Sequence, residues 1–401
     1  MEEQKVILSE NLEQTLTEAV QSTPHDRLFV ICDTNTHELC LPLVSGFECM
    51  KGAHVITILP GDEHKTLQQV EQVWSELQKN GATRHSLCVN IGGGMVTDLA
   101  GFALSTFKRG MSFINIPTTL LAMVDASVGG KTGFNYGGLK NEIGVFSNAD
   151  AVILDATFLR TLDRENILSG YAEMLKHGLI ATDSSFATDL YGLIRTNTKE
   201  EVRKRPCESV VKKENVRISP CESVAMISQL LAFDVEQPDL TELGRMVAES
   251  VQVKQRIVLE DPREQGLRKA LNLGHTIGHA FEAMALGQIG PMSPISPMRP
   301  ILHGYAVAYG LMCELYLSVM KTGFPVDTMR QVNSFILEHY GRMTITCDDY
   351  PTLLQLMTHD KKNTGNQINF TLLHNVGDLA LNQTATKEEI EEALDFYREG
   401  L

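Results

Sequence analysis

Two histidines spaced four residues apart are the first candidate chemical groups in this chain. In the segment 272–279 (NLGHTIGH), the spacing places the imidazoles of His275 and His279 on one face of a helix. Zinc proteases use this spacing, but Thr follows His275 where their motif requires a catalytic Glu, so we expect no protease. Glu173 and His303 are further candidates, because a mixed carboxylate and imidazole set suits a divalent ion. On spacing alone, the alternative that both helix histidines are core residues stays open.

A glycine-rich turn is a candidate nucleotide site. Gly92, Gly93 and Gly94 follow the apolar run 87–91 and precede an apolar helical stretch. Glycines there allow a diphosphate to approach backbone N–H groups at a helix N-terminus. The spacing departs from Gly-x-Gly-x-x-Gly, so a purely structural turn is the alternative. Asp33 favours the nucleotide, because an acidic side chain at a strand end accepts the ribose hydroxyls.

The segment 128–132 (VGGKT) superficially resembles a P-loop. The glycine required five positions before the Gly-Lys pair is absent, since Asp125 stands there. A triphosphate hydrolase is therefore not expected, but Lys131 is placed to bind an anion.

The elements that must position these residues follow from the hydrophobic pattern. Apolar runs predict strands over Leu28–Cys32, His54–Leu59, Leu87–Ile91, Phe113–Ile116 and Ala151–Leu154, and a helix is predicted over 67–80. Strands alternating with helices indicate a doubly wound parallel sheet. After Leu162 helical periodicity dominates, with two β-like segments, Met343–Ile345 and Ile368–Leu373. We therefore expect an α/β fold, with a Rossmann-like parallel-sheet domain over 1–162 followed by a mostly α-helical domain over 163–401.

Two segments do not fit this plan. The first is 195–225. Its part 195–217 contains eight Lys or Arg and four Glu, and it shows almost none of the hydrophobic periodicity of a helix. Residues 287–300 are rich in Gly and Pro and cannot continue a helix. We interpret both as inserts in surface loops, with a regulatory or partner-binding role as the alternative.

Composition restricts the partners. The 401 residues carry a formal net charge of −15, with 43% hydrophobic and 21% charged residues, as expected for a globular protein of two domains. The acidic balance argues against nucleic acid or an anionic membrane surface as a partner. The N-terminus shows no signal peptide, no apolar run is long enough to span a membrane, and the eight cysteines include no Cys-x-x-Cys. We expect a cytoplasmic enzyme.

Taken together, the motifs resemble one known family. They are Gly92-Gly93-Gly94 with Asp98 and Gly101-Phe102, the run 117–133 (PTTLLAMVDASVGGKTG), Lys140-Asn141, Tyr171-Ala172-Glu173, and Gly274-His275-x-x-Gly278-His279. This set is similar to 3-dehydroquinate synthase, a sugar phosphate cyclase, over nearly the whole chain except the inserts. The segment 170–178 (GYAEMLKHG) resembles the Bacteroides-type members of that family.

The resemblance implies a lyase of the shikimate pathway that leads to chorismate and the aromatic amino acids. Its substrate would be 3-deoxy-D-arabino-heptulosonate 7-phosphate, a sugar acid phosphate, and its products 3-dehydroquinate and phosphate. The family uses NAD for a transient oxidation at C5, then eliminates phosphate, reduces the ketone again and closes the ring by an aldol step. NAD is not consumed, and the expected metal is Zn²⁺, with Co²⁺ as an alternative.

The resemblance also implies site residues, position by position. The metal ligands would be Glu173, His275 and His303. The NAD-contacting positions would be Asp33, Asn35, Gly93, Gly94, Met95, Asp98, Thr118, Thr119, Leu121, Thr161 and Leu162. The substrate-binding positions would be Lys65, Arg109, Lys131, Lys140, Asn141, Lys254, Arg268, Asn272, His279, and Lys361 or Lys362. The catalytic set would be Asp125, Lys131, Asn141, Lys176 and His279.

Several of these positions have more specific expected roles. Lys131 and Asn141 are expected to bind the phosphate group, and Lys254 and Arg268 the carboxylate, because a doubly anionic substrate needs several such donors. Arg109 matches an arginine that reaches the phosphate of the neighbouring subunit, so the resemblance implies a homodimer.

Three alternatives remain beside this interpretation. Another cyclase, such as 2-deoxy-scyllo-inosose synthase or a sedoheptulose 7-phosphate cyclase, would share the NAD and zinc elements and differ in substrate-facing residues. A metal-dependent dehydrogenase of the glycerol dehydrogenase type would share the architecture. A non-catalytic protein that kept the scaffold is the third alternative, and the intact candidate ligands argue against it.

Overall fold

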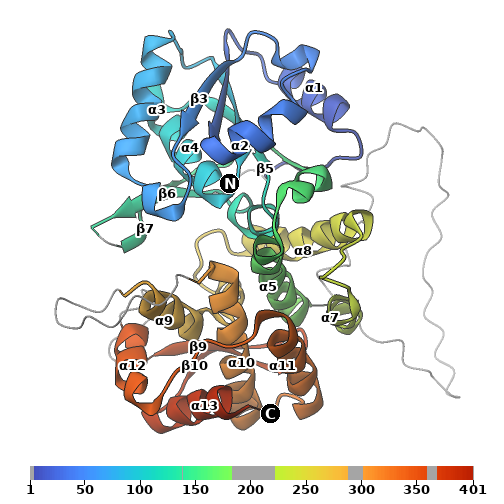
Figure 1. Ribbon diagram of the computed structural model, residues 1–401, viewed down its shortest axis with the longest axis vertical. Helices are drawn as coiled ribbons and strands as arrows, with labels where there is room; N and C mark the ends of the chain where they lie inside the picture. Colours follow the sequence, from blue (N-terminus) through green and yellow to red (C-terminus); the bar gives the residue numbers. More distant parts are fainter. Residues whose placement is uncertain (1–3, 138, 183–221, 288–300, 359–367, 401) are drawn as a thin grey trace, which may run out of the picture.

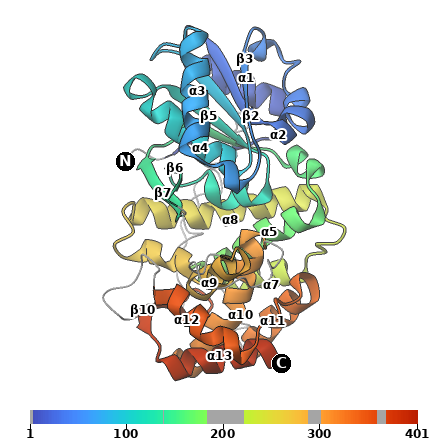
Figure 2. The same ribbon diagram turned by 60° about the vertical axis from the view of Figure 1, so that its left-hand side comes forward.

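A computed structural model of the chain describes residues 4–137, 139–182, 222–287, 301–358 and 368–400. Both predicted inserts fall largely outside the described residues, as do Lys361 and Lys362. Figures 1 and 2 show a sheet-containing unit built from the first part of the chain and a helical unit built from the second, with α5 and α8 between them.

The first unit is built on a six-stranded parallel sheet with the order β1-β8-β5-β4-β2-β3. Its strands are β1 (Val6–Leu8), β2 (Leu28–Asp33), β3 (His54–Ile58), β4 (Leu87–Gly92), β5 (Ser112–Pro117) and β8 (Ala151–Leu154). Every residue of β2, β4 and β8 is buried, as expected for parallel strands covered on both faces. The five predicted strands are confirmed with ends within one residue, and β1 is an addition.

Helices α1 (Leu12–Ser22), α2 (Thr34–Leu39), α3 (Leu67–Lys79) and α4 (Gly94–Thr106) belong to this unit. The predicted helix over 67–80 is confirmed as α3, which buries Val70, Val73 and Leu77. Sequence reasoning missed an antiparallel hairpin, β6 (Lys131–Tyr136) with β7 (Leu139–Phe146). Its strands carry Gly, Asn and Lys and lack the apolar runs from which the other strands were predicted.

The second unit is mostly helical. Its helices are α5 (Arg164–Ile180), α7 (Glu222–Ala232), α8 (Leu240–Glu260), α9 (His275–Ala285), α10 (His303–Thr322), α11 (Val326–Tyr340), α12 (Tyr350–Thr358) and α13 (Lys387–Glu399). Its only described sheet pairs β9 (Asn369–Asn375) with β10 (Asp378–Thr384). The predicted β-like segment Ile368–Leu373 is thus confirmed from Asn369 onward, as the first part of β9. No helix among the described residues is both long enough and apolar enough to cross a bilayer.

The prediction for Met343–Ile345 is wrong, because this segment forms no strand. No strand of the described residues pairs with Met343, whose backbone is hydrogen-bonded to the hydroxyl of Tyr397 instead. That hydroxyl accepts a hydrogen bond from Met343 N at 2.7 Å and donates one to Met343 O at 3.2 Å. A side chain of α13 therefore replaces the strand partner that an apolar run would otherwise need.

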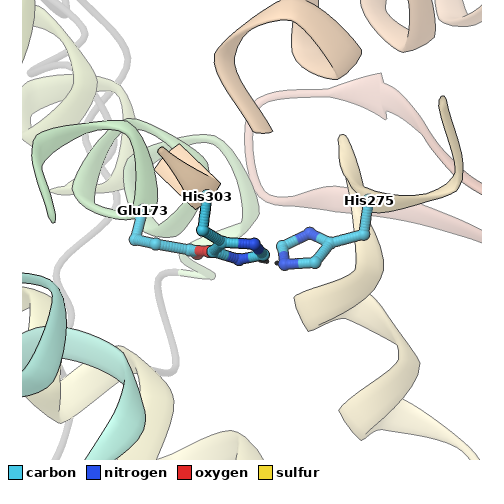
Figure 3. Close-up of side chains that lie close together, drawn as sticks. All are labelled: Glu173, His275 and His303. Atoms are coloured by element: carbon cyan, nitrogen blue, oxygen red, sulfur yellow. Dashed lines mark ion pairs between the residues drawn. The ribbon is translucent and has the colours of Figure 1, made fainter. Parts of the chain in front are cut away.

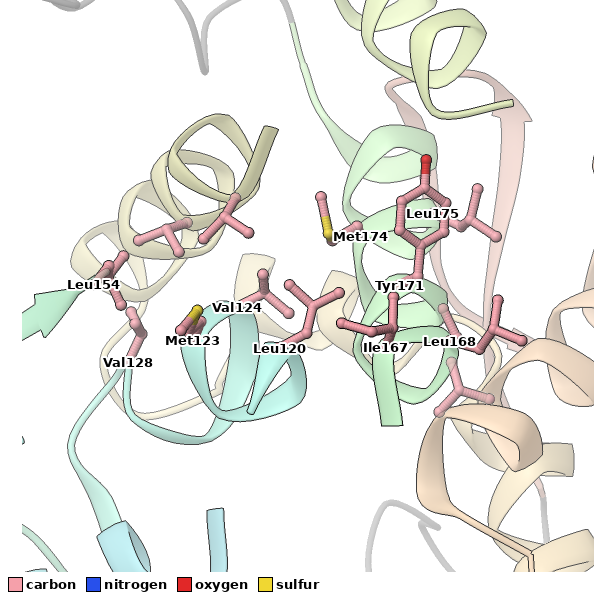
Figure 4. Packing of buried hydrophobic residues seen from close by; sticks show 14 of the residues in the cluster. Leu120, Met123, Val124, Val128, Leu154, Ile167, Leu168, Tyr171, Met174 and Leu175 are labelled. Atoms are coloured by element: carbon pink, nitrogen blue, oxygen red, sulfur yellow. The ribbon is translucent and has the colours of Figure 1, made fainter. Parts of the chain in front are cut away.

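An apolar contact joins the two units. Figure 4 shows Leu120, Met123 and Val124 of the segment after β5 close to Ile167 and Tyr171 of α5. These five side chains are at most 5% exposed. The predicted domain division at residue 162 lies just before α5, so this helix carries the chain from the sheet to the helical unit.

Candidate functional site

The three predicted metal ligands come from three different helices and converge. Glu173 lies within α5, whereas His275 and His303 are the first residues of α9 and α10. The Nε2 atoms of both histidines lie 3.3 Å from the same atom, Oε1 of Glu173 (Figure 3). The structure therefore brings Glu173 together with two histidines that lie more than a hundred positions further along the sequence.

Two glycines of α10 allow this convergence. A Cβ added at Gly304 would lie 1.8 Å from the carbonyl oxygen of Ser169 in α5. A Cβ at Gly310 would lie 1.9 Å from the carbonyl oxygen of Gly274, directly before α9. Since no side chain fits at such distances, only glycine lets α10 approach both neighbouring helices closely.

Glu173 is a fully buried carboxylate that remains charged. Burial alone would raise its pKa, but the ammonium group of Lys176 and the imidazole of His275 outweigh burial and hold the pKa well below its ordinary value. Lys176 pairs with Oε2 of Glu173, and neither carboxylate oxygen accepts a well-formed hydrogen bond from the described residues. A buried anion in this condition is suited to a cation.

Each of the two imidazoles uses its Nδ1 atom elsewhere. Nδ1 of His275 lies 3.1 Å from the carbonyl oxygen of Leu273, and Nδ1 of His303 lies 3.3 Å from Oε2 of Glu282. Both Nε2 atoms are thereby left facing Glu173. One carboxylate and two imidazoles form a donor set that binds Zn²⁺ or a similar ion and leaves coordination positions open. The residues present therefore fit a catalytic metal.

His279 lies beside this centre. Its ring centroid is 5.3 Å from that of His275 and 6.0 Å from that of His303. It also belongs to a second group of clustered donors, with Glu282 and His303. The predicted i, i+4 pair is thus confirmed as a cluster.

Each predicted substrate-side lysine that the structure describes is in an ion pair. Lys254 Nζ lies 2.6 Å from Oδ1 of Asp125, and Lys65 Nζ lies 2.5 Å from Oδ2 of Asp98. Burial works against the charge on Asp125, but the ammonium groups of Lys254 and Lys176 together outweigh it and hold the pKa of that carboxyl well below its usual range. Lys65 also donates to Oδ1 of Asn141 at 2.5 Å.

Two further lysines join the units of the molecule. Lys131, at the start of β6, lies 2.7 Å from Glu264, which also accepts a hydrogen bond from Asn272 at 3.1 Å. Lys140, in β7, lies 2.8 Å from Oε1 of Glu282 in α9. These pairs run from the hairpin of the first unit to the helical unit.

The glycine turn lies at the carboxyl edge of the sheet. The chain proceeds from β2 to β3 in one direction and from β4 to β5 in the other, so the topological switch point lies between β2 and β4. Asp33 ends β2 and Gly93 follows β4, which places them on either side of this point. A Cβ at Gly93 would meet the Thr119 side chain at 3.0 Å, so the turn has little room for a larger residue.

The other predicted NAD positions lie at the same edge or in the segments that follow it. Asn35 is in the first turn of α2, and Met95 and Asp98 are in α4. Thr118, Thr119 and Leu121 follow β5, and Thr161 and Leu162 follow β8. This edge fits a dinucleotide, although Asp33 already accepts a hydrogen bond from Thr36 N at 2.8 Å as the N-cap of α2.

Comparison with known proteins identifies the family. The model of the 3-dehydroquinate synthase N-terminal domain matches residues 55–169, and that of the C-terminal domain matches residues 170–363. The chain is 47% identical over 400 residues to the 3-dehydroquinate synthase of Parabacteroides distasonis, covering 100% of this chain and 99% of that protein. The chain belongs to the 3-dehydroquinate synthase family.

Other similarities agree with this family. The 3-dehydroquinate synthase of Bacillus pumilus is 30% identical over 98% of this chain and 94% of its own length. A structure of 2-deoxy-scyllo-inosose synthase with carbaglucose-6-phosphate, NAD+ and Co2+ has a TM-score of 0.74 at 20% identity, covering 99% of this chain and 96% of that one. ValA, a 2-epi-5-epi-valiolone synthase from Streptomyces hygroscopicus with NAD+ and Zn2+, has a TM-score of 0.73 at 22% identity, covering 99% and 97%. The similarity to these two structures shows a shared fold alone.

Not every position expected from the family lies in this cluster. Arg109 lies in an exposed turn, and the described residues offer its guanidinium group no hydrogen bond or ion pair. Arg268 is buried, donating to the carbonyl oxygens of Pro262 at 2.9 Å and Gly129 at 3.4 Å. The functional roles expected for the individual residues stay predictions.

Sequence reasoning missed the acidic partners. Glu264 and Glu282 hold Lys131 and Lys140, and neither was singled out. A signal for Glu282 existed, because His275, His279 and Glu282 follow the spacing i, i+4, i+7 on one helix face. Glu264 lies outside any helix or strand and carries no such periodic signal.

Sequence reasoning also missed His177, which lies close to Glu173 and Asp125. Its Nδ1 atom is 2.7 Å from Ser250 Oγ in α8, and its Nε2 atom has no hydrogen-bond partner among the described residues. Burial, reinforced by the nearby ammonium of Lys176, lowers the pKa of His177 to about 3. The imidazole is therefore neutral in the folded protein at neutral pH.

Replacement of a metal ligand gives the first prediction. His275→Ala should lower metal affinity by more than about 100-fold, because only two ligands remain. Metal per chain, measured by mass spectrometry after gel filtration, should fall to background. His374→Ala is the matched control, since this exposed histidine lies outside the candidate metal cluster and its ring nitrogen is paired with the carbonyl oxygen of Thr322. Full metal content in His275→Ala would contradict the ligand assignment.

The buried neutral His177 predicts a pH dependence of stability. Its folded pKa of about 3 lies below the value of about 6.5 in the unfolded chain, so acid protonates the unfolded state first. Its contribution is complete above pH ~6.5 and is lost as the pH falls, at about 1.4 kcal/mol per pH unit. Urea unfolding of chelator-treated protein should show this loss, and His177→Gln should lack it. Equal slopes for both proteins would show that His177 does not titrate this way.

Proposed function

We propose that this chain converts 3-deoxy-D-arabino-heptulosonate 7-phosphate to 3-dehydroquinate and phosphate, as a carbon–oxygen lyase of the shikimate pathway. The observation that carries the proposal is the convergence of Glu173, His275 and His303. Lys176 pairs with Glu173 directly, and Lys140 and Lys254 are held next to the cluster by Glu282 and Asp125. Membership of the family and the Parabacteroides relative support the reaction.

We propose NAD and Zn²⁺ as cofactors, with Co²⁺ as an alternative ion. NAD would accept a hydride from the substrate and return it, which leaves no net oxidation. Residues 92–94 and Asp33 would hold its diphosphate and ribose at the switch point. Glu173, His275 and His303 would hold the metal, which supplies a Lewis acid for neighbouring substrate oxygens.

Cationic and amide side chains would orient the substrate. Lys131 and Asn141, which lie in the hairpin, would bind the phosphate group, and Lys254 and Arg268, which lie in the helical unit, would bind the carboxylate. Lys65, Lys140, Asn272 and Lys361 or Lys362 are the remaining donors in this proposal. The two anionic groups would then be held from opposite units, which fixes the direction of the sugar chain between them.

The remaining catalytic candidates hold charge and protons. His279 would donate or relay a proton by hydrogen bonding rather than bind the metal. Asp125 holds Lys254 in position, and Lys176 compensates the charge of Glu173. The departing phosphate can itself accept the C6 proton, so these residues would mainly position the reacting groups. We propose a cytoplasmic location for this reaction.

A coupled assay tests the function. Protein with NAD, a divalent metal and the heptulosonate phosphate should release one phosphate per substrate, with no lasting rise in NADH absorbance. Release only from sedoheptulose 7-phosphate or glucose 6-phosphate would instead assign another cyclase. NADH accumulating with alcohol consumed would assign a dehydrogenase.

We also propose a homodimer in which Arg109 acts in the site of the neighbouring subunit. Lys108, Arg109 and Gly110 have φ values of 50°, 70° and 119°, so a strained turn presents the arginine. In the same unit, Tyr136 and Phe146 of the hairpin are 55% and 57% exposed, which suits a covering partner.

Mixing two inactive variants tests the shared site. Arg109→Ala and Lys131→Ala homodimers should each be nearly inactive. After unfolding and refolding together in equal amounts, mixed dimers would contain one intact site, and activity should return to about a quarter of wild type. No recovery, despite dimers in sedimentation analysis, would show that Arg109 serves its own subunit or none.

A further inference from the structure

Glu282 is a buried carboxylate whose two oxygens serve different partners. Its side chain is 8% exposed and lies in α9, seven residues after the candidate ligand His275. Oε2 lies 3.3 Å from Nδ1 of His303, and Oε1 lies 2.8 Å from Nζ of Lys140. A single side chain therefore contacts both a candidate metal ligand and a candidate substrate lysine.

The contact with His303 affects how this imidazole can bind a metal. A carboxylate that accepts a proton from Nδ1 fixes the tautomer, leaves Nε2 as the free lone pair and makes the ring a stronger ligand. His275 differs, because its Nδ1 faces the neutral carbonyl oxygen of Leu273. Of the two histidine ligands, His303 is thus the one whose outer partner carries a charge.

The contact with Lys140 extends this arrangement across the two units. Lys140 lies in β7 and also pairs with Asp62 at 3.1 Å, at the end of the sheet unit nearest the hairpin. Its ammonium partly neutralises Glu282 and thereby weakens the pull of that carboxylate on His303. An anion that draws Lys140 away would leave the full charge of Glu282 on His303.

We propose that Glu282 is a positioning residue that links the two halves of the site, orienting His303 for the metal while restraining Lys140 from the anion. This inference rests on the proposed metal centre, and it holds for any anionic substrate. It implies opposite effects of the Glu282 charge, which strengthens metal binding and weakens anion binding. A merely structural role would not produce opposite effects, since general loosening weakens both.

The variant Glu282→Gln tests the metal half. Titration of the metal-free protein with Co²⁺ should show an affinity about 10- to 100-fold lower than wild type, with altered visible absorption bands. Glu264→Gln is the matched control, because Glu264 also holds a lysine but contacts no candidate ligand. Its Co²⁺ affinity should stay within about threefold of wild type.

The same variant tests the anion half. Inorganic phosphate, titrated into metal-free protein with NAD, should bind Glu282→Gln roughly twofold or more tighter, because Lys140 has lost a competing partner. NAD binding at the wild-type level verifies that the variant is folded. Wild-type Co²⁺ affinity, or weaker binding of both Co²⁺ and phosphate, would overturn the proposal.

A double variant distinguishes an effect that passes through His303 from a general loosening of the structure. In the His303→Ala background, Glu282→Gln should change the remaining Co²⁺ affinity by less than about threefold, since its effect passes through His303. An undiminished effect there would also overturn the proposal. These titrations use no sugar substrate, so a failure of the proposed reaction in the phosphate-release assay would be a separate result.

Discussion

The buried charge of Glu173 is the constraint on which the rest of this structure depends. A carboxylate with no exposed surface is tolerated only where cations surround it, and loss of such a partner typically costs about 3–5 kcal/mol. Lys176, one turn further along α5, supplies one compensating charge from the same helix. The other partners, His275 and His303, must come from elsewhere in the chain, which is why three helices meet at this point.

Meeting this constraint determines how the helices pack. Helix α10 must carry His303 to Glu173 and pass α9 near His275, and its glycines at 304 and 310 remove the side chains that would prevent it. Gly170 does the same on α5, since a Cβ there would lie 2.4 Å from the backbone nitrogen of Leu121. That approach brings the helix that carries Glu173 against the segment that carries Asp125. The metal ligands and the edge of the sheet are therefore held in one rigid arrangement by close backbone contacts.

Much of this fold could be predicted from the sequence, where the local pattern and the tertiary structure agree. The five apolar strand runs and α3 can be recognised because buried parallel strands and amphipathic helices have distinct hydrophobic patterns. The hairpin β6–β7 could not be predicted this way, since its strands lack an uninterrupted apolar run and carry polar residues such as Lys131, Lys140 and Asn141. Met343–Ile345 shows the opposite failure, where an apolar segment is buried without a strand partner.

The candidate site, like the fold, has a part that local sequence patterns reveal and a part that they do not. His275 and His279 follow a helical spacing that sequence alone reveals, whereas Glu173 and His303 lie too far away for any spacing to connect them. Residue chemistry made Glu173 and His303 candidates beside the two helix histidines, and the family resemblance assigned Glu173, His275 and His303 to the metal and His279 to the substrate. It indicated the positions with expected roles but not their acidic partners, because a carboxylate that holds a lysine in place has no motif of its own.

The acidic partners of the lysines explain how an acidic chain can hold several cations in one site. Each of the five site lysines, Lys65, Lys131, Lys140, Lys176 and Lys254, is paired with a carboxylate of the chain. The charges of these lysines are thus compensated as they stand, and an anionic substrate that binds them must compete with internal carboxylates. A divalent cation between Glu173 and the histidines would add two positive charges to this balance. In that case the bound metal raises the affinity for the anion, and the bound anion raises the affinity for the metal. An anion too short to reach both units would displace fewer carboxylates and would gain less binding free energy from the metal charge.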